Sequence, residues 1–133
     1  MLKVFGILLV TFLCTFTNVS SGQCPKFNKS STLAGKLRVV AYSPHNEKKD
    51  NTLYCLSEEF PPKRPGGSSL IGQIVDSDNS NYIVYANCLD LNSFYMITTK
   101  TYSKKNSLTA EELQQVKDIH KKNGFKKPIF TCW

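Results

Sequence analysis

This chain has five cysteines, and the four that follow Cys14 of its N-terminal apolar run place the strongest constraint on how it folds. They are Cys24, Cys55, Cys88 and Cys132, whose positions differ successively by 31, 33 and 44. An even number of cysteines in a short exported chain predicts two disulfides, for which three pairings are possible. Zinc sites take closely paired Cys or His ligands, whereas the 2 histidines of this chain, His45 and His120, are isolated. We therefore expect a small disulfide-bonded domain without a metal ion.

The first residues indicate that the chain is exported. Lys3 precedes an uncharged apolar run over residues 4–16, and small residues follow at 20–22. This order is typical of a cleavable signal peptide, and the run is shorter than the roughly 20 residues of a membrane-spanning helix. We predict a signal peptide over residues 1–22, a mature domain over residues 23–133, secretion to the extracellular space and no membrane span.

The mature chain is predicted to be cationic. Removal of Lys3 would leave 16 basic and 10 acidic side chains in 111 residues, which suits a single domain with a net charge of +6. Such a charge can favour an acidic partner. The lysines are scattered, however, and no basic run alternates with aromatic residues, so we expect solubilising surface charge and no nucleic-acid partner. Asn28 begins an Asn-Lys-Ser sequon, a candidate glycosylation site in an exported protein.

Five segments read as strands because they are rich in β-branched and apolar residues and end at turn residues. They are residues 37–42, 52–60, 70–75, 82–88 and 94–101. Short polar turns join the last three, which favours an antiparallel meander. We expect residues 128–133 to form an extended tail that returns Cys132 to the body of the domain.

One helix is signalled after the strands. Thr109 is a natural N-cap, Glu112 completes a capping box, and Leu108 and Leu113 occupy the positions of a hydrophobic staple. The apolar stripe at helical spacing comprises Leu113, Val116 and Ile119. Asn123 and Gly124 are typical of a helix C-terminus. We expect His120 to lie on the helix surface and to bind no metal.

The order of these features carries a family resemblance. The segments concerned are Cys24-Pro25, residues 33–40, 42–44, 52–55, 77–79, 81–88 and 94–100, the helix at 109–124, and Cys132. Together they resemble the lipocalin family, most closely its apolipoprotein D and insect bilin-binding branch. The resemblance implies a mainly β fold, an antiparallel meander with one C-terminal helix. It also implies that Cys24 pairs with Cys88 and Cys55 with Cys132.

The chain departs from the lipocalin pattern in three places. Leu37 stands where the family has a tryptophan, and Lys100 stands where it has the arginine that packs over that tryptophan. Only 32 residues separate Cys55 from Cys88, so the third, fourth and fifth of eight strands are missing. The expected fold is thus a truncated lipocalin-like barrel, either an open sheet or a narrower closed barrel.

The resemblance implies a secreted binder or carrier of a small hydrophobic molecule such as a lipid, pigment or odorant, with no cofactor. Candidate ligand-binding residues are Phe94, Met96, Tyr85 and Tyr54. The competing interpretation is that Phe94 and Met96 pack in the core and that the tyrosines are ordinary strand residues.

A second hypothesis is a secreted protein-binding module of the triabin-like salivary inhibitor kind, which acts through its surface without a ligand cavity. A third treats the chain as a defective or alternatively spliced product. We do not expect an enzyme, because no nucleophile has a nearby histidine in a recognisable motif, and Glu58 and Glu59 point to opposite faces of their strand.

Overall fold

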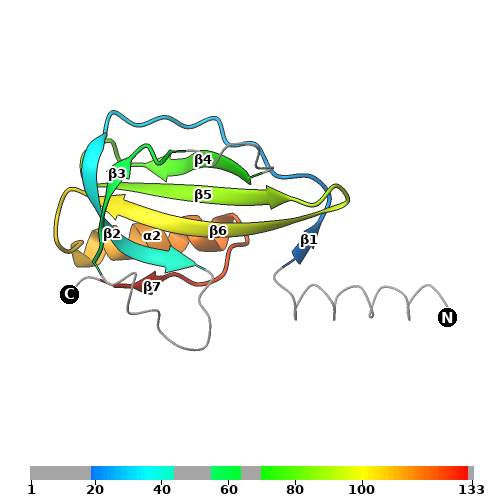
Figure 1. Ribbon diagram of the computed structural model, residues 1–133. Helices are drawn as coiled ribbons and strands as arrows, with labels where there is room; N and C mark the ends of the chain where they lie inside the picture. The colour runs from blue at the N-terminus through cyan, green and yellow to red at the C-terminus, as the bar shows by residue number, and fades with distance from the viewer. Residues whose placement is uncertain (1–18, 44–54, 64–69, 132–133) are drawn as a thin grey trace.

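The structure is a computed structural model that describes residues 19–43, 55–63 and 70–131. An antiparallel sheet curls into a half-barrel, and one helix packs across one of its faces (Figure 1). We call the side of the sheet under the helix the helix face, and the opposite, concave side the inner face. The expected mainly β fold with a single C-terminal helix is confirmed.

The elements follow the order β1 (Val19–Ser21), β2 (Gly35–Ser43), β3 (Ser57–Phe60), β4 (Leu70–Ser77), β5 (Tyr82–Asp90), β6 (Phe94–Ser103), α2 (Ala110–Lys122) and β7 (Ile129–Phe130). Within the sheet the strands lie in the order β3-β2-β6-β5-β4, and in addition β1 pairs with β6 and β7 with β2. No β3–β4 pairing occurs among the described residues. The sheet is therefore open, one of the two expected outcomes.

The strand predicted over residues 52–60 is wrong at Cys55 and Leu56, the first of these residues that the structure describes. Cys55 has a φ of 47°, in the left-handed region that few side chains adopt, and β3 begins only at Ser57. The local apolar pattern did not reveal this turn. The expected tail is partly confirmed, because β7 pairs with Ala41 and Tyr42 of β2, whereas residues 132–133 lie outside the described ranges.

The N-terminal segment is tied to β5 by a disulfide and to the edge strand β4 by hydrogen bonds. A disulfide joins Cys24 to Cys88 with a Cα–Cα distance of 6.0 Å, as the resemblance implied. The Gln73 side chain accepts a hydrogen bond from the Phe27 backbone N–H and donates one to the Pro25 carbonyl, both at 2.9 Å. These contacts cover part of an edge that would otherwise be open to pairing with another chain.

The predicted Cys55–Cys132 bridge remains a prediction, because Cys132 lies outside the described residues. The residues adjacent to the two cysteines, Leu56 and Thr131, both form hydrogen bonds with Val39 of β2. The Val39 N–H donates to the Leu56 carbonyl at 2.7 Å, and the Thr131 hydroxyl donates to the Val39 carbonyl at 2.7 Å. Both neighbours thus bind one residue of β2, which supports the predicted pairing.

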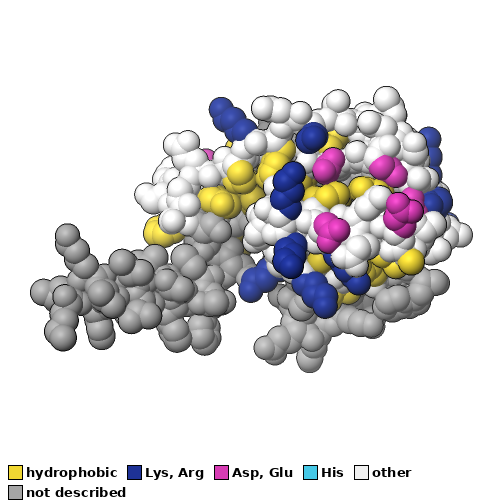
Figure 2. Space-filling view, turned by 180° about the vertical axis from the view of Figure 1, so that it is seen from behind, with side chains coloured by type: hydrophobic (Ala, Val, Ile, Leu, Met, Phe, Trp, Pro, Cys, Tyr) yellow, Lys and Arg dark blue, Asp and Glu magenta, His cyan; other side chains and the backbone are white. Residues whose placement is uncertain are grey.

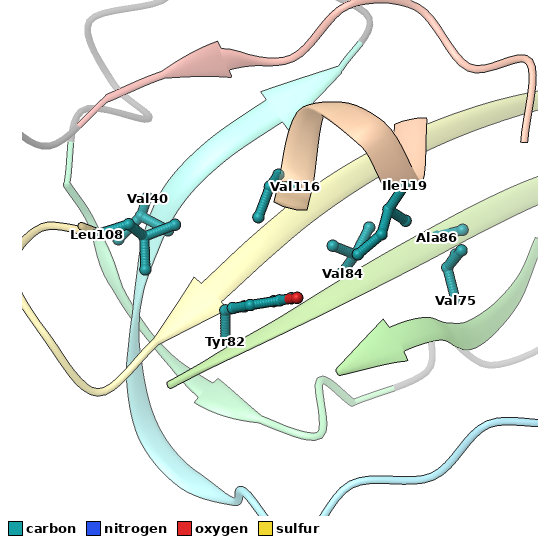
Figure 3. Packing of buried hydrophobic residues seen from close by; sticks show 8 residues of the cluster. All are labelled: Val40, Val75, Tyr82, Val84, Ala86, Leu108, Val116 and Ile119. Atoms are coloured by element: carbon teal, nitrogen blue, oxygen red, sulfur yellow. The ribbon is translucent and has the colours of Figure 1, made fainter. Parts of the chain in front are cut away.

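Helix α2 begins and ends as predicted. Thr109 and Glu112 form a reciprocal capping box, Asn123 is the C-cap, and Gly124 has the positive φ of a helix stop. Val116 and Ile119 point from the helix toward the sheet (Figure 3). The cluster on the helix face comprises Val40, Val75, Tyr82, Val84, Ala86, Leu108, Val116 and Ile119.

The expectation that His120 lies on the helix surface is wrong. Its side chain is buried, with only 1% of the residue exposed. Ring atom Nδ1 lies 2.8 Å from the Val116 carbonyl, so it donates there, and Nε2 then accepts from the Thr99 hydroxyl at 2.8 Å. Burial lowers the pKa of His120, although the bond to Val116 acts in the opposite direction. The imidazole is a neutral link between α2 and β6.

The β4–β5 turn is organised by Asp78, the residue that matched the lipocalin turn. Its Oδ1 accepts the backbone N–H groups of Ser80, Asn81 and Tyr82 at 3.0, 2.7 and 3.0 Å. Burial raises the pKa of this carboxyl, but the hydrogen bonds to the charged form outweigh it and the pKa is lowered. The turn thus sets the register of the two strands that carry much of the inner face.

Candidate functional site

The inner face carries a second buried cluster, which forms the base of the candidate site. Its members are Leu33, Leu37, Val39, Phe60, Ile83 and Tyr102. Tyr102 lies between Val39 and Ile83 in the ladder, and the next row on the same face places Lys100 between Tyr42 and Tyr85. Alternation along the strands directs these rows to the inner face. A lysine therefore stands in the middle of a largely apolar and aromatic surface.

An ion pair on β3 and β6 holds this lysine. Lys100 Nζ lies 2.7 Å from Glu58 Oε1, with side chains 29% and 23% exposed, and the Tyr102 hydroxyl donates to Glu58 Oε2 at 2.9 Å. Burial, and then the hydrogen bond to Glu58, raise the pKa of Tyr102. The phenol therefore stays protonated and acts as a hydrogen-bond donor. Glu58 joins the edge strand β3 to the centre of the sheet.

Three aromatic rings pack beside this ion pair. The ring centroid of Phe60 lies 5.4 Å from that of Tyr85 and 5.1 Å from that of Tyr102. The two tyrosine rings are 6.3 Å apart in an edge-on arrangement. Edge-to-face contacts at these distances are favourable for aromatic rings. These three rings come from three different strands, and we call them the aromatic wall.

Tyr85 extends over a glycine of the neighbouring strand. A Cβ at Gly72 would lie 1.8 Å from the Tyr85 hydroxyl oxygen, so only glycine leaves room for the tyrosine there. The same tyrosine and glycine line two hollows on the inner face, with volumes of about 170 and 450 Å³. Tyr85 therefore separates two adjoining cavities.

The two cavities differ in character. The smaller one contains the Lys100–Glu58 ion pair and is lined by Glu58, Pro62, Lys63, Leu70, Gly72, Tyr85, Asn87, Lys100 and Tyr102. The larger one lies where β3 approaches β4 under the N-terminal segment, and is lined by Phe27, Lys29, Ser31, Leu33, Ala34, Phe60, Pro61, Gly72, Gln73, Ile74 and Tyr85. An apolar groove with a lysine and a carboxylate at one end suits an elongated molecule with one polar group.

The predicted ligand-binding residues separate in the structure. Tyr85 lines both cavities. Phe94 and Met96 share the strand face of Lys100 by alternation, but they are 50% and 37% exposed and line neither cavity. Met96 is four residues from Lys100, about 13 Å along the strand. Tyr54 lies outside the described residues.

Sequence reasoning missed the polar members of the site. Glu58 and Phe60 are two residues apart on β3 and so share a face, which was a readable signal. Their contact with Tyr102, 42 or more residues further on, was not readable. Lys100 was noticed only as a substitute for arginine. In the structure Leu37 is buried and pairs with Glu58 in the β2–β3 ladder. Lys100 forms an ion pair with the same Glu58.

A further hollow of about 360 Å³ lies beside α2 and is lined by Gln114, Lys117, Asp118, His120, Lys121, Phe125, Lys127 and Pro128. Figure 2 shows the molecule from behind, with lysine and arginine side chains spread among acidic ones rather than gathered in one patch. Both ring nitrogens of His120 have partners inside the fold. The hollow therefore presents lysines together with Gln114 and Asp118, which bond each other, while the imidazole of His120 is already bonded inside the fold.

Metal-binding clusters and membrane-spanning helices are both absent from residues 19–43, 55–63 and 70–131. No group of three or more His, Cys, Asp or Glu side chains is close enough to hold a metal ion there. No helix in that part of the chain has the length and apolar character to cross a membrane.

No family model matches the chain, and no curated protein matches it significantly.

Proposed function

We propose that the mature chain is a secreted, lipocalin-like binder of a small hydrophobic molecule and that the ligand lies on the inner face against Tyr85. The observation that carries this proposal is the pair of adjoining cavities on either side of that tyrosine. The larger cavity, about 450 Å³, is within the usual range for small-molecule sites. The resemblance to lipocalins supports the same function.

The lining suggests how a ligand would be oriented. Phe60, Ile74 and Leu33 offer apolar contacts in the larger cavity, and Lys100 and Asn87 offer hydrogen-bond donors in the smaller one. A ligand that spans both would place a carboxylate or hydroxyl group near Lys100 and an apolar body along the aromatic wall. Retinoids and fatty acids have this form.

A fluorescence titration tests the proposal. Retinol and cis-parinaric acid should quench the emission of the single tryptophan saturably. Asn87→Phe fills the smaller cavity and should weaken binding at least tenfold. Gln114→Phe makes the same amide-to-phenyl change on the exposed surface of α2 and should leave binding unchanged. Absence of saturable quenching in the wild-type protein, or equal effects of the two variants, would refute the proposed site.

A protein-binding function is the second candidate, and exposed apolar side chains favour it. Phe94, Leu91 and Met96 are 50%, 46% and 37% exposed and cluster around the β5–β6 turn. Under this alternative both ligands leave the emission unchanged, and a Phe94→Ser variant loses binding to a protein partner. The titration above therefore separates the two functions.

Secretion and glycosylation are part of the same proposal. Asn28 is exposed in the segment between the disulfide and β2, so the sequon is accessible to modification. Expression of the full chain in a eukaryotic cell should yield a protein in the medium that begins at Gln23. Its mass should fall on treatment with an N-glycosidase, and the Asn28→Gln variant should show no such loss.

A further inference from the structure

Strand β1 covers part of β6 that no other described strand covers on that side. Val19, Ser20 and Ser21 pair with Met96, Tyr95 and Phe94, and the Gly22 N–H donates to the Ser93 carbonyl at 2.7 Å. Strand β2 pairs only with the later part of β6, from Thr99 to Ser103. Within the described residues, positions 94–96 therefore have β1 alone as their neighbour on this side, and no strand is paired with positions 97–98 there.

All of β1 belongs to the segment that the sequence marks for removal. Cleavage before Gln23 would take away the three paired residues and the Gly22 hydrogen bond together. The exposed edge would then carry unsatisfied backbone donors and acceptors, which readily pair with another strand. Residues 94–98 read Phe-Tyr-Met-Ile-Thr, an uncharged run of residues that favour strands.

We infer that removal of the leader exposes this edge and that a second copy of the mature chain pairs with it, β6 against β6, to form a dimer. Antiparallel pairing about a two-fold axis at Met96 places each Met96 opposite its counterpart and Phe94 opposite Thr98. These positions include two of the exposed large apolar side chains, Phe94 and Met96. The inference rests on cleavage before Gln23 and does not depend on ligand binding.

The occupant is a second copy for two reasons. The edge already accepts an antiparallel strand in register, and β6 is itself a strand of matching composition present in every copy. In a chain that keeps β1, the covalently attached strand would hold the edge at a high effective concentration and exclude the second copy. The leader residues thus act as a temporary cover.

Sedimentation equilibrium of the secreted protein, with its N-terminus identified by mass spectrometry, tests the inference. The form beginning at Gln23 should be a dimer at micromolar concentration, and a form beginning at Val19 should be a monomer. Met96→Glu and Met96→Lys each place like charges opposite one another and should raise the dimer dissociation constant at least tenfold, or about 1.4 kcal/mol. A mixture of the two variants should dimerise again.

Leu91→Glu is the matched control, because Leu91 is exposed but precedes the strand, and it should leave the dimer intact. A monomeric mature protein, a dimer that both Met96 variants retain, or a secreted form that still contains Val19 would each overturn the inference. Recovery in the mixed sample cannot come from misfolded chains. A monomer that still binds retinol would reject the dimer and leave the proposed ligand function standing.

Discussion

Glu58 offers the sharpest test of how the inner face is held together. Its carboxylate accepts from the hydroxyl of Tyr102, a residue that is 1% exposed, and pairs with Lys100, which is 29% exposed. An unsatisfied buried hydroxyl costs about 1–3 kcal/mol, whereas a partly exposed ion pair contributes about 0–1 kcal/mol. Glu58→Leu removes both and should destabilise the protein by about 2–3 kcal/mol.

Two further variants divide this loss between its causes. Glu58→Gln keeps an oxygen acceptor for Tyr102 but loses the charge, so it should cost about 1 kcal/mol or less. Lys100→Met leaves the Tyr102–Glu58 hydrogen bond in place and should cost no more than that.

Urea unfolding and thermal melting of the mature protein measure these differences. For 111 residues, an unfolding entropy of about 0.23 kcal/mol per kelvin converts the loss in Glu58→Leu to a decrease in Tm of about 10 °C. If Glu58→Gln or Lys100→Met were as destabilising as Glu58→Leu, the ion pair would be the main contribution and this reasoning would fail.

Three other predictions concern the disulfide, a buried histidine and a glycine. Loss of the Cys24–Cys88 bridge, with a sequence separation of 64 residues, in the Cys24→Ala/Cys88→Ala double variant should cost about 4 kcal/mol by the chain-entropy relation, measured by urea unfolding. Burial lowers the pKa of His120, so the unfolded chain binds more protons as the pH falls below about 6.5. Stability should decline there, and the pH dependence should flatten in His120→Gln; an unchanged slope would contradict it. Gly72→Ala would set a Cβ 1.8 Å from the Tyr85 hydroxyl oxygen, so it should displace that ring and weaken retinol quenching; unchanged quenching would contradict the placement of the ligand against Tyr85.

The helix and the main strands could be predicted because their signals are local. Thr109 and Glu112 are three residues apart, and their reciprocal bonds need no other part of the fold. Strands β4, β5 and β6 follow their apolar runs closely, since short polar turns bound them. Cys55 shows the limit of such patterns. Its backbone is left-handed and the strand begins only at Ser57, although its neighbours favour a strand.

The candidate site could be predicted only in part. Tyr85 was named and lines both cavities, but Phe94 and Met96 lie further along the same face. Alternation places them on the same face as Lys100, yet alternation alone does not tell how far along a strand the neighbouring strands extend. Pairing between β2 and β6 stops at Thr99, and that boundary separates the enclosed part of the face from the exposed part.

The amino-acid sequence by itself determined which segments become strands, where the helix begins and ends, and which cysteine meets Cys24 once the resemblance is accepted. Only the tertiary structure decided that Glu58 reaches Lys100 and Tyr102, that Gly72 makes room for Tyr85, and that His120 is buried. The physical reason is that capping and alternation act over a few residues. Register, strand order and curvature bring together groups whose meeting depends on the whole chain.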